Sequence, residues 1–172
     1  MEQFTSHIIR ENSPEYNTTL SIGYIRTCSC AKTHINCITP KEWLKSQLGV
    51  WQFYYESRDV RDKKKHPAAF PISLCRKIIE LFTHQGELVL DPFVGSGTTL
   101  IAANDLNRNA IGFDLQSEYI DLCEKRLSQQ PNLFNRTRQL AIQDDAKNIP
   151  QYIDPNTLSL IWTSPPYANL LN

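Results

Sequence analysis

The chain has 172 residues, of which 41% are hydrophobic and 21% charged, an ordinary balance for a soluble globular protein that excludes disordered and fibrous classes. Its longest apolar runs fall far short of the roughly 20 residues that span a bilayer, and the N-terminus lacks a signal-peptide pattern. We therefore expect a cytoplasmic protein without a membrane segment. The formal net charge is zero, so the chain as a whole lacks the strongly basic character of many nucleic-acid-binding proteins.

Residues 1–55 show no clean helical or strand period, and we treat them as an N-terminal subregion that precedes a main domain over residues 56–172. A short apolar helix face is predicted within this subregion. It would consist of Trp43, Leu44, Leu48, Val50 and Trp51.

Five cysteines without a regular spacing indicate a reducing compartment rather than a disulfide framework. Cys28, Cys30, His34 and Cys37 form a dense group of potential zinc ligands that could stabilise the N-terminal subregion. Because the Cys-x-Cys spacing is not that of ordinary zinc fingers, buried thiols without a metal are the favoured interpretation. Cys75 and Cys123 fall on predicted helices and are expected in the core, whereas no role is predicted for His7 and His84.

From Ser73 onward, helical and strand patterns alternate along the chain. A parallel, doubly wound α/β sheet is the fold class that this alternation predicts. Three helices are expected: one that begins at Ser73 and stops by Gly86, one from Thr98 to Leu106 and one from Ser117 to Leu127. The hydroxyls of Thr98, Thr99 and Ser117 are expected to cap the second and third helices. The expected strands are Leu88–Leu90 ending at Asp91, Ala110–Asp114, Gln139–Ile142 and Leu158–Trp162.

A glycine turn follows the first of these strands, in the string Asp91-Pro92-Phe93-Val94-Gly95-Ser96-Gly97-Thr98-Thr99. Such a turn, opening a helix, lets the backbone approach a bulky ligand closely. A dinucleotide fingerprint would need a third glycine where Leu100 stands, and no Gly-Lys-Ser/Thr phosphate loop exists. The pattern thus favours a ligand without a pyrophosphate or triphosphate, although simple chain reversal also explains the glycine pair taken alone.

Acidic residues end the next two predicted strands. Asp114 could accept hydrogen bonds from two vicinal ribose hydroxyls, although an isolated aspartate there could also cap a helix. Asp144 and Asp145 follow the third strand, where a carboxylate could accept from an adenine amino group, and we favour Asp145 for that role. Together these positions predict a site for an adenosine-containing ligand.

The string that begins at Asp91 resembles the first motif of the bacterial DNA amino-methyltransferases, which modify adenine or cytosine. The segment His66-Pro67-Ala68-Ala69-Phe70-Pro71 is similar to that family's His-Pro-x-x-Phe-Pro segment, and a rigid loop before a helix is compatible with it. The resemblance implies a Rossmann-like, S-adenosylmethionine-dependent methyltransferase fold. It implies cofactor-binding roles for His66, Phe70, Asp91, Pro92, Phe93, Gly95, Gly97, Thr98, Thr99, Asp114 and Asp145.

A second motif, Ser164-Pro165-Pro166-Tyr167, follows the fourth predicted strand. In isolation it would be a loop or polyproline turn. After the first motif it indicates catalysis, because a fixed backbone carbonyl and the Ser164 side chain can hold an exocyclic amino group while Tyr167 stacks on a flipped base. No metal is needed for this transfer.

The Ser-Pro-Pro-Tyr form resembles the cytosine-N4 branch, so site-specific cytosine-N4 methylation of double-stranded DNA in a restriction-modification system is the predicted function. Adenine-N6 methylation, an amino group on RNA or protein, and a catalytically inactive cofactor-binding fragment or partner subunit remain alternatives. The resemblance implies a sheet of seven strands, of which about four are traced in this sequence. We therefore expect an incomplete sheet that is truncated after Tyr167 and has Leu158–Trp162 at its edge. A C-terminal partner chain is one way in which the sheet could be completed.

Overall fold

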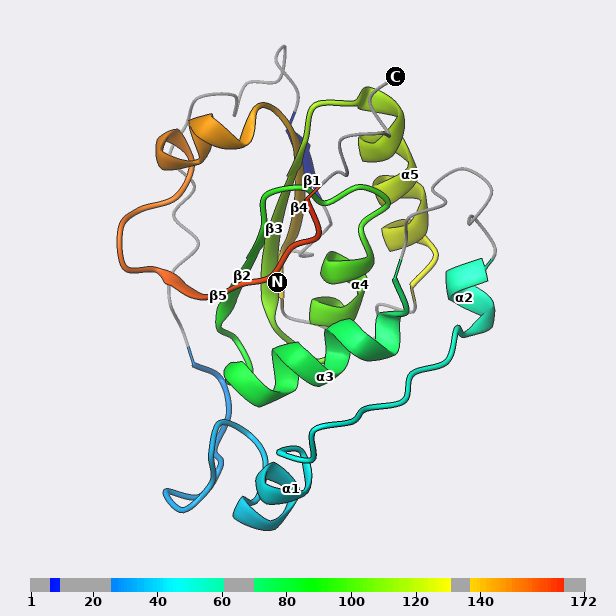
Figure 1. The fold of residues 1–172 in the computed structure, drawn as a ribbon. Coiled ribbons are helices and arrows are strands. Elements are labelled where there is room, and N and C mark those ends of the chain that lie inside the picture. Colours follow the sequence, from blue (N-terminus) through cyan, green and yellow to red (C-terminus); the bar gives the residue numbers. More distant parts are fainter. Residues whose placement is uncertain (1–6, 10–25, 61–69, 131–136, 166–172) are drawn as a thin grey trace.

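A computed structural model of the chain describes residues 7–9, 26–60, 70–130 and 137–165. Their central feature is a parallel five-stranded sheet with the strand order β1-β4-β3-β2-β5 (Figure 1). The strands are β1 (His7–Ile9), β2 (Leu88–Asp91), β3 (Asn109–Asp114), β4 (Gln139–Gln143) and β5 (Leu158–Ile161). The predicted α/β class is confirmed, and the four strands expected from the sequence are all present.

The helices are α1 (Pro40–Lys45), α2 (Ser57–Val60), α3 (Ile72–Phe82), α4 (Thr98–Asp105) and α5 (Ser117–Ser128), with a 3₁₀ helix η1 (Ala146–Gln151). The predicted hydroxyl caps are wrong, because Gly97 and Gln116 occupy the N-cap positions of α4 and α5 and make no side-chain cap hydrogen bond. In the part of the chain that the structure describes, no helix is long and apolar enough to cross a bilayer.

The two faces of the sheet bury different residues, as the two-residue period of a strand requires. Val89, Ala110 and Ala141 face α3, α4 and α5, whose apolar side chains complete one core cluster. The alternate strand positions, among them Leu90 and Phe113, pack with Tyr152 and Ile153 on the opposite face. Both faces of the central strands are therefore covered, which explains why β2 is buried along its whole length (Figure 1).

The strand β1 was not predicted from the sequence. It pairs with β4, placing Ile8 beside Ala141, and so part of the N-terminal subregion joins the main sheet. Three residues cannot display a two-residue alternation, and only the pairing with β4 identifies them as a strand.

The strand β5 lies at an edge of the described sheet, as expected, and is paired on its inner side with β2. Its residues are only half-buried or exposed, and the Ile161 side chain is 59% accessible to solvent. Since β2 lies between β3 and β5, the chain reverses its direction of strand addition at β2. This is the switch point at which ligands of such sheets bind.

The apolar helix face predicted for the N-terminal subregion is wrong for four of its five members. The exposed fractions are 66% for Leu44, 69% for Leu48, 81% for Val50 and 37% for Trp51. The helix α1 is instead fixed at its start by a capping box between Thr39 and Glu42. Local capping, rather than burial of an apolar stripe, accounts for this short helix.

Candidate active site

The glycine turn connects β2 to α4 at the carboxyl edge of the sheet. Gly95 and Gly97 both have positive φ, at 49° and 81°, where residues with a side chain are strained. The turn is closed by a hydrogen bond from the Gly97 amide to the Val94 carbonyl (2.9 Å) and anchored to β3 by one from the Val94 amide to the Phe113 carbonyl (2.8 Å). The backbone is thus held in the tight form that a close-approaching ligand requires.

Asp114 lies beside this turn, as the sequence predicted from its place at the end of β3. One carboxylate oxygen accepts from the Gly95 amide (3.0 Å) and the other from the Gln116 amide (3.0 Å). A carboxylate group has about four lone-pair sites, and the residue is only half-buried. Asp114 therefore orients the glycine turn from the end of β3.

Asp91 lies underneath the turn and is only 2% exposed. Its carboxylate accepts hydrogen bonds from the Thr99 hydroxyl (2.6 Å), the Thr163 hydroxyl (2.7 Å) and the Phe93 amide (3.1 Å). Thr163 immediately precedes Ser164, so Asp91 joins the end of β2, the start of α4 and the segment after β5. Asp91 and Thr99 thus hold the two sequence motifs together from the interior.

Burial raises the pKa of Asp91, and the three hydrogen bonds only partly oppose this effect. A raised folded-state pKa makes the carboxyl group favour folding below its ordinary pKa and lose that contribution as the pH rises through the folded value. Relative to Asp91→Asn, the free energy of unfolding of the wild type should therefore fall as the pH rises from the ordinary aspartate pKa through the raised one. Urea denaturation of both proteins across this range measures the difference, and a constant or rising difference would contradict it.

The other residues predicted to bind the cofactor differ in their exposure to solvent. Phe93 is 43% exposed, Pro92 is half-buried, and Thr98 is buried under the turn. Phe70 stacks edge-to-face on Trp162, with 6.2 Å between ring centroids. His66 lies outside the described residues.

Asp145 and Asp144 differ in what occupies their carboxylates. Asp144 accepts from the Asn148 amide group (2.8 Å) and the Tyr152 hydroxyl (2.8 Å) and is committed to the fold. Asp145 caps η1 through the Lys147 amide (2.9 Å) and forms an exposed ion pair with the Lys147 side chain. The Asp145 carboxylate therefore has the more exposed contact of the two, and its ion pair with Lys147 can exchange for another partner.

Ser164 and Pro165 follow β5 at the same edge of the sheet as the glycine turn. The Trp162 amide donates to the Leu90 carbonyl (2.9 Å), which continues the β2–β5 pairing up to the second motif. Ser164 is half-buried and Pro165 exposed. Pro166 and Tyr167 lie outside the described residues.

One supporting residue, Arg126, was not predicted from the sequence. Its side chain reaches from α5 to the glycine turn, where Nη1 donates to the Ser96 carbonyl (2.7 Å), the Ser96 hydroxyl (2.9 Å) and the Thr98 hydroxyl (3.2 Å). Arg126 is only 5% exposed. The sequence signal was a charged residue in the apolar stripe that contains Cys123 and Leu127, a position where an arginine needs buried partners.

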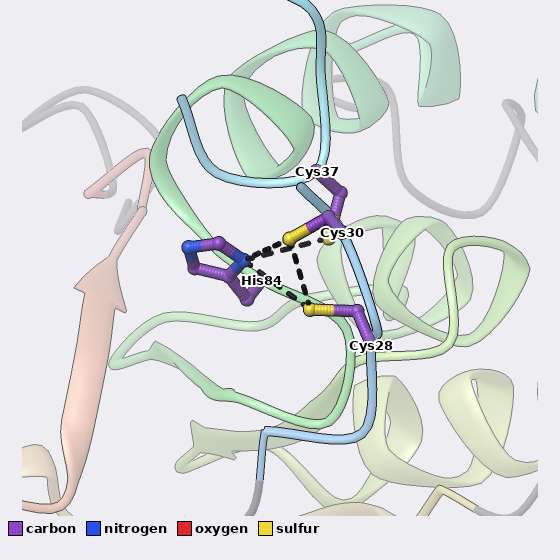
Figure 2. Close-up of side chains that lie close together, drawn as sticks. All are labelled: Cys28, Cys30, Cys37 and His84. Atoms are coloured by element: carbon purple, nitrogen blue, oxygen red, sulfur yellow. Dashed lines mark hydrogen bonds between the residues drawn. The ribbon is translucent and has the colours of Figure 1, made fainter. Parts of the chain in front are cut away.

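The cysteine group is also assembled differently from the sequence expectation. Cys28, Cys30 and Cys37 lie together but are half-buried, whereas the favoured interpretation expected buried thiols. The fourth potential ligand beside them is His84, from the turn between α3 and β2, and not His34 (Figure 2). His84, for which the sequence suggested no role, thus lies next to the three thiols. Cys75 and Cys123 are fully buried core residues, as predicted, and burial raises the pKa of each thiol to about 12.

The described geometry agrees with a comparison against protein families, in which the DNA methylase model (N6_N4_Mtase) matches residues 5–125. The chain belongs to this DNA methylase family. This is the family that the first motif resembles, and the matched residues include that motif.

Individual relatives match this chain over shorter segments. The type II methyltransferase M.HpaI of Haemophilus parainfluenzae is 38% identical over 86 residues, which cover 50% of this chain and 27% of M.HpaI. M.BglII of Bacillus subtilis is 32% identical over 112 residues, or 65% of this chain and 29% of M.BglII. A DNA modification methylase candidate from Thermus thermophilus is similar in structure, with a TM-score of 0.47 at 30% identity over 62% of this chain and 40% of that one. The matched part thus spans about a quarter to a third of these curated relatives' length.

Proposed function

We propose that this chain is the cofactor-binding part of a DNA amino-methyltransferase of the restriction-modification type that uses S-adenosylmethionine. The observation that carries the proposal is the hydrogen bond between Asp91 and Thr163, which holds the glycine turn and Ser164 at one edge of the sheet. A methyl donor and an amino group bound at these two motifs would meet there. The family membership and the type II methyltransferase relatives support it.

The residues at this edge suit S-adenosylmethionine in three respects. The turn offers backbone without a side chain at Gly95, Asp114 can accept from the ribose hydroxyls, and Asp145 can exchange its Lys147 contact for an adenine amino group. Phe70, with the His66 segment before it, would line the methionine side. When bound, the sulfonium supplies an activated methyl group, so the reaction needs no metal.

The chain's own catalytic task is to localise the lone pair of an exocyclic amino nitrogen that is delocalised into its ring. In the proposed mechanism, Ser164 and the backbone carbonyl beside Pro165 accept the amino hydrogens, and Tyr167 stacks on the base. The base must leave the duplex, at a cost of a few kcal/mol that stacking and edge contacts offset. Pro166 stiffens the segment so that these acceptors stay in place.

Cytosine N4 is the proposed target, supported by serine as the first residue of the second motif. Adenine N6 is the second candidate, because the family model covers both amino groups by name. The outer edge of β5, with Ile161 exposed, supports a further proposal that additional strands, in a partner chain or elsewhere, pair there in the active enzyme.

Calorimetric titration with S-adenosylmethionine tests the cofactor site. Asp114→Ala should lower the affinity by at least about 30-fold, because loss of a hydrogen-bonded charged group costs about 2 kcal/mol. Asp154→Ala, which removes a carboxylate from the exposed loop before β5, should leave the affinity unchanged. Equal affinities for the wild type and Asp114→Ala, in folded proteins, would refute the proposed ribose contact.

Product analysis tests the target base. Double-stranded DNA is incubated with methyl-labelled cofactor, and its nucleosides are then separated by chromatography. N4-methylcytosine is the expected product, and N6-methyladenine would overturn the proposed base while retaining the enzyme class. The chain is also co-expressed with the C-terminal part of a relative, which could pair with the edge of β5. If the cofactor then binds but no DNA is methylated, the result would favour a catalytically inactive cofactor-binding fragment.

A further inference from the structure

Four potential metal ligands converge at the junction between the N-terminal subregion and the main domain (Figure 2). The Sγ atoms of Cys28, Cys30 and Cys37 and the Nδ1 atom of His84 all lie within 4.8 Å of one another. The Nδ1 atom is 3.3, 3.4 and 3.6 Å from the three sulfurs, and the Cys28 and Cys30 sulfurs are 3.4 Å apart. One imidazole nitrogen thus faces three thiols at once.

These separations are close to those of a tetrahedral zinc site. Zinc–sulfur bonds of about 2.3 Å and zinc–nitrogen bonds of about 2.0 Å place sulfur and nitrogen about 3.5 Å apart and two sulfurs about 3.8 Å apart. A disulfide between Cys28 and Cys30 would need about 2.05 Å between their sulfurs. The observed distances therefore fit ligands around a common ion better than a covalent bridge.

The surrounding backbone fixes the ligands in this arrangement. The Gln85 amide donates to the Cys37 sulfur (3.3 Å), a contact that stabilises a thiolate. The Thr27 amide donates to the Gln85 carbonyl (2.9 Å), and the His84 amide donates to the Glu87 carboxylate (2.8 Å). The segment before Cys28 is thus hydrogen-bonded to the turn that carries His84.

A buried cation stands next to this cluster. Arg108 is 2% exposed, and its guanidinium donates to the Thr83 hydroxyl and carbonyl and to the Leu106 carbonyl, all uncharged. Burial lowers the pKa of Arg108, and negative charge on Cys37, Glu80, Cys28 and Glu87 opposes this effect. Because zinc with three thiolates and a neutral imidazole carries one net negative charge, such a centre would balance the buried arginine.

We infer that Cys28, Cys30, Cys37 and His84 bind one structural Zn²⁺ ion that fastens the N-terminal subregion to the turn between α3 and β2. Four protein ligands leave no open coordination position, so the ion has a structural role and takes no part in methyl transfer. The ligation crosses from residues 28–37 to residue 84 and so holds the segment that leads directly into β2. The inference is independent of the proposed methyltransferase activity.

Zinc analysis of the whole chain, purified without an affinity metal column or chelator, tests this site. One zinc per chain is expected, falling at least tenfold in His84→Ala and Cys28→Ser. The matched controls, His34→Ala and Cys75→Ala, should each keep one zinc, since neither side chain belongs to the cluster. Because a ligand variant could lose zinc by unfolding, His84→Cys is included and should retain one ion through four thiolates.

Cobalt substitution gives a second readout that does not depend on stability. The Co²⁺ protein should show strong thiolate-to-metal charge-transfer absorption and the visible bands of a tetrahedral centre with three sulfurs, and His84→Cys should shift these bands. Zinc below a tenth of an equivalent in the folded wild type would overturn the inference. So would loss of zinc in His34→Ala with retention in His84→Ala, or a disulfide between Cys28 and Cys30 in the protein purified under reducing conditions.

Discussion

Gly97→Ala should destabilise the protein by about 2–5 kcal/mol, the sum of left-handed backbone strain and overpacking in a filled core. Gly97 has φ of 81° at the start of α4, and an added Cβ atom would lie 2.3 Å from the Cys123 sulfur. Cys123 is fully buried, and its Cβ and Cα atoms would lie only 3.1 and 3.3 Å from the added atom, so rotation of the sulfur alone does not relieve the contact. Urea denaturation of the full chain measures the loss.

Gly49→Ala is the matched control, because a Cβ atom there would meet nothing within 4 Å. Its stability should stay within about 0.5 kcal/mol of the wild type. Cys123→Ala in the Gly97→Ala background should restore part of the lost stability, since it removes the closest of the clashing atoms. A Gly97→Ala protein as stable as Gly49→Ala would show that the turn does not pack on α5 as described.

Arg126→Met should cost about 2–4 kcal/mol of stability and weaken the binding of S-adenosylmethionine. The substitution keeps the aliphatic stem but leaves the Ser96 carbonyl and the Ser96 and Thr98 hydroxyls without their donor in a buried place. The affinity loss follows because the Ser96 backbone lies between the two glycines of the turn. Denaturation and calorimetric titration give the two effects separately.

Lys125→Met removes a positive charge from the neighbouring, exposed position of α5 and should change neither quantity. Arg126→Lys should fall between the wild type and Arg126→Met, since a single ammonium group retains the charge but cannot reproduce the position of Nη1. Equal stabilities for Lys125→Met and Arg126→Met would contradict the role assigned to Arg126.

The main domain was predictable from the sequence because its signals are local. Buried parallel strands are continuous apolar runs, so Leu88–Leu90 and Gln139–Ile142 were identifiable without any knowledge of their partners. The glycine turn and the carboxylate at Asp114 have fixed chemical requirements at strand ends. Ends of elements were less predictable: the hydroxyls of Thr98 and Thr99 hydrogen-bond to Arg126 and Asp91 instead of capping α4.

The metal ligands show what a local pattern cannot supply. His34 lies between the cysteines in the sequence, and that proximity made it the expected ligand. His84 is distant in the chain but is brought to the cysteines by the packing of residues 26–38 on the end of α3 (Figure 2). Only a folded chain determines which imidazole reaches three thiols.

The sequence by itself determined the fold class, the order of the strands from β2 onward and of the α-helices from α3 onward, and the first motif, which lies within the residues that the family model matches. These depend on short-range periodicity and on residue types that a turn or a ligand demands. The tertiary structure decided the strand β1, the burial of Asp91 beneath the turn, the Arg126 support and His84 as a ligand. Each of these results from contacts between segments far apart in the chain, whose free energy appears only when the sheet and its helices are packed together.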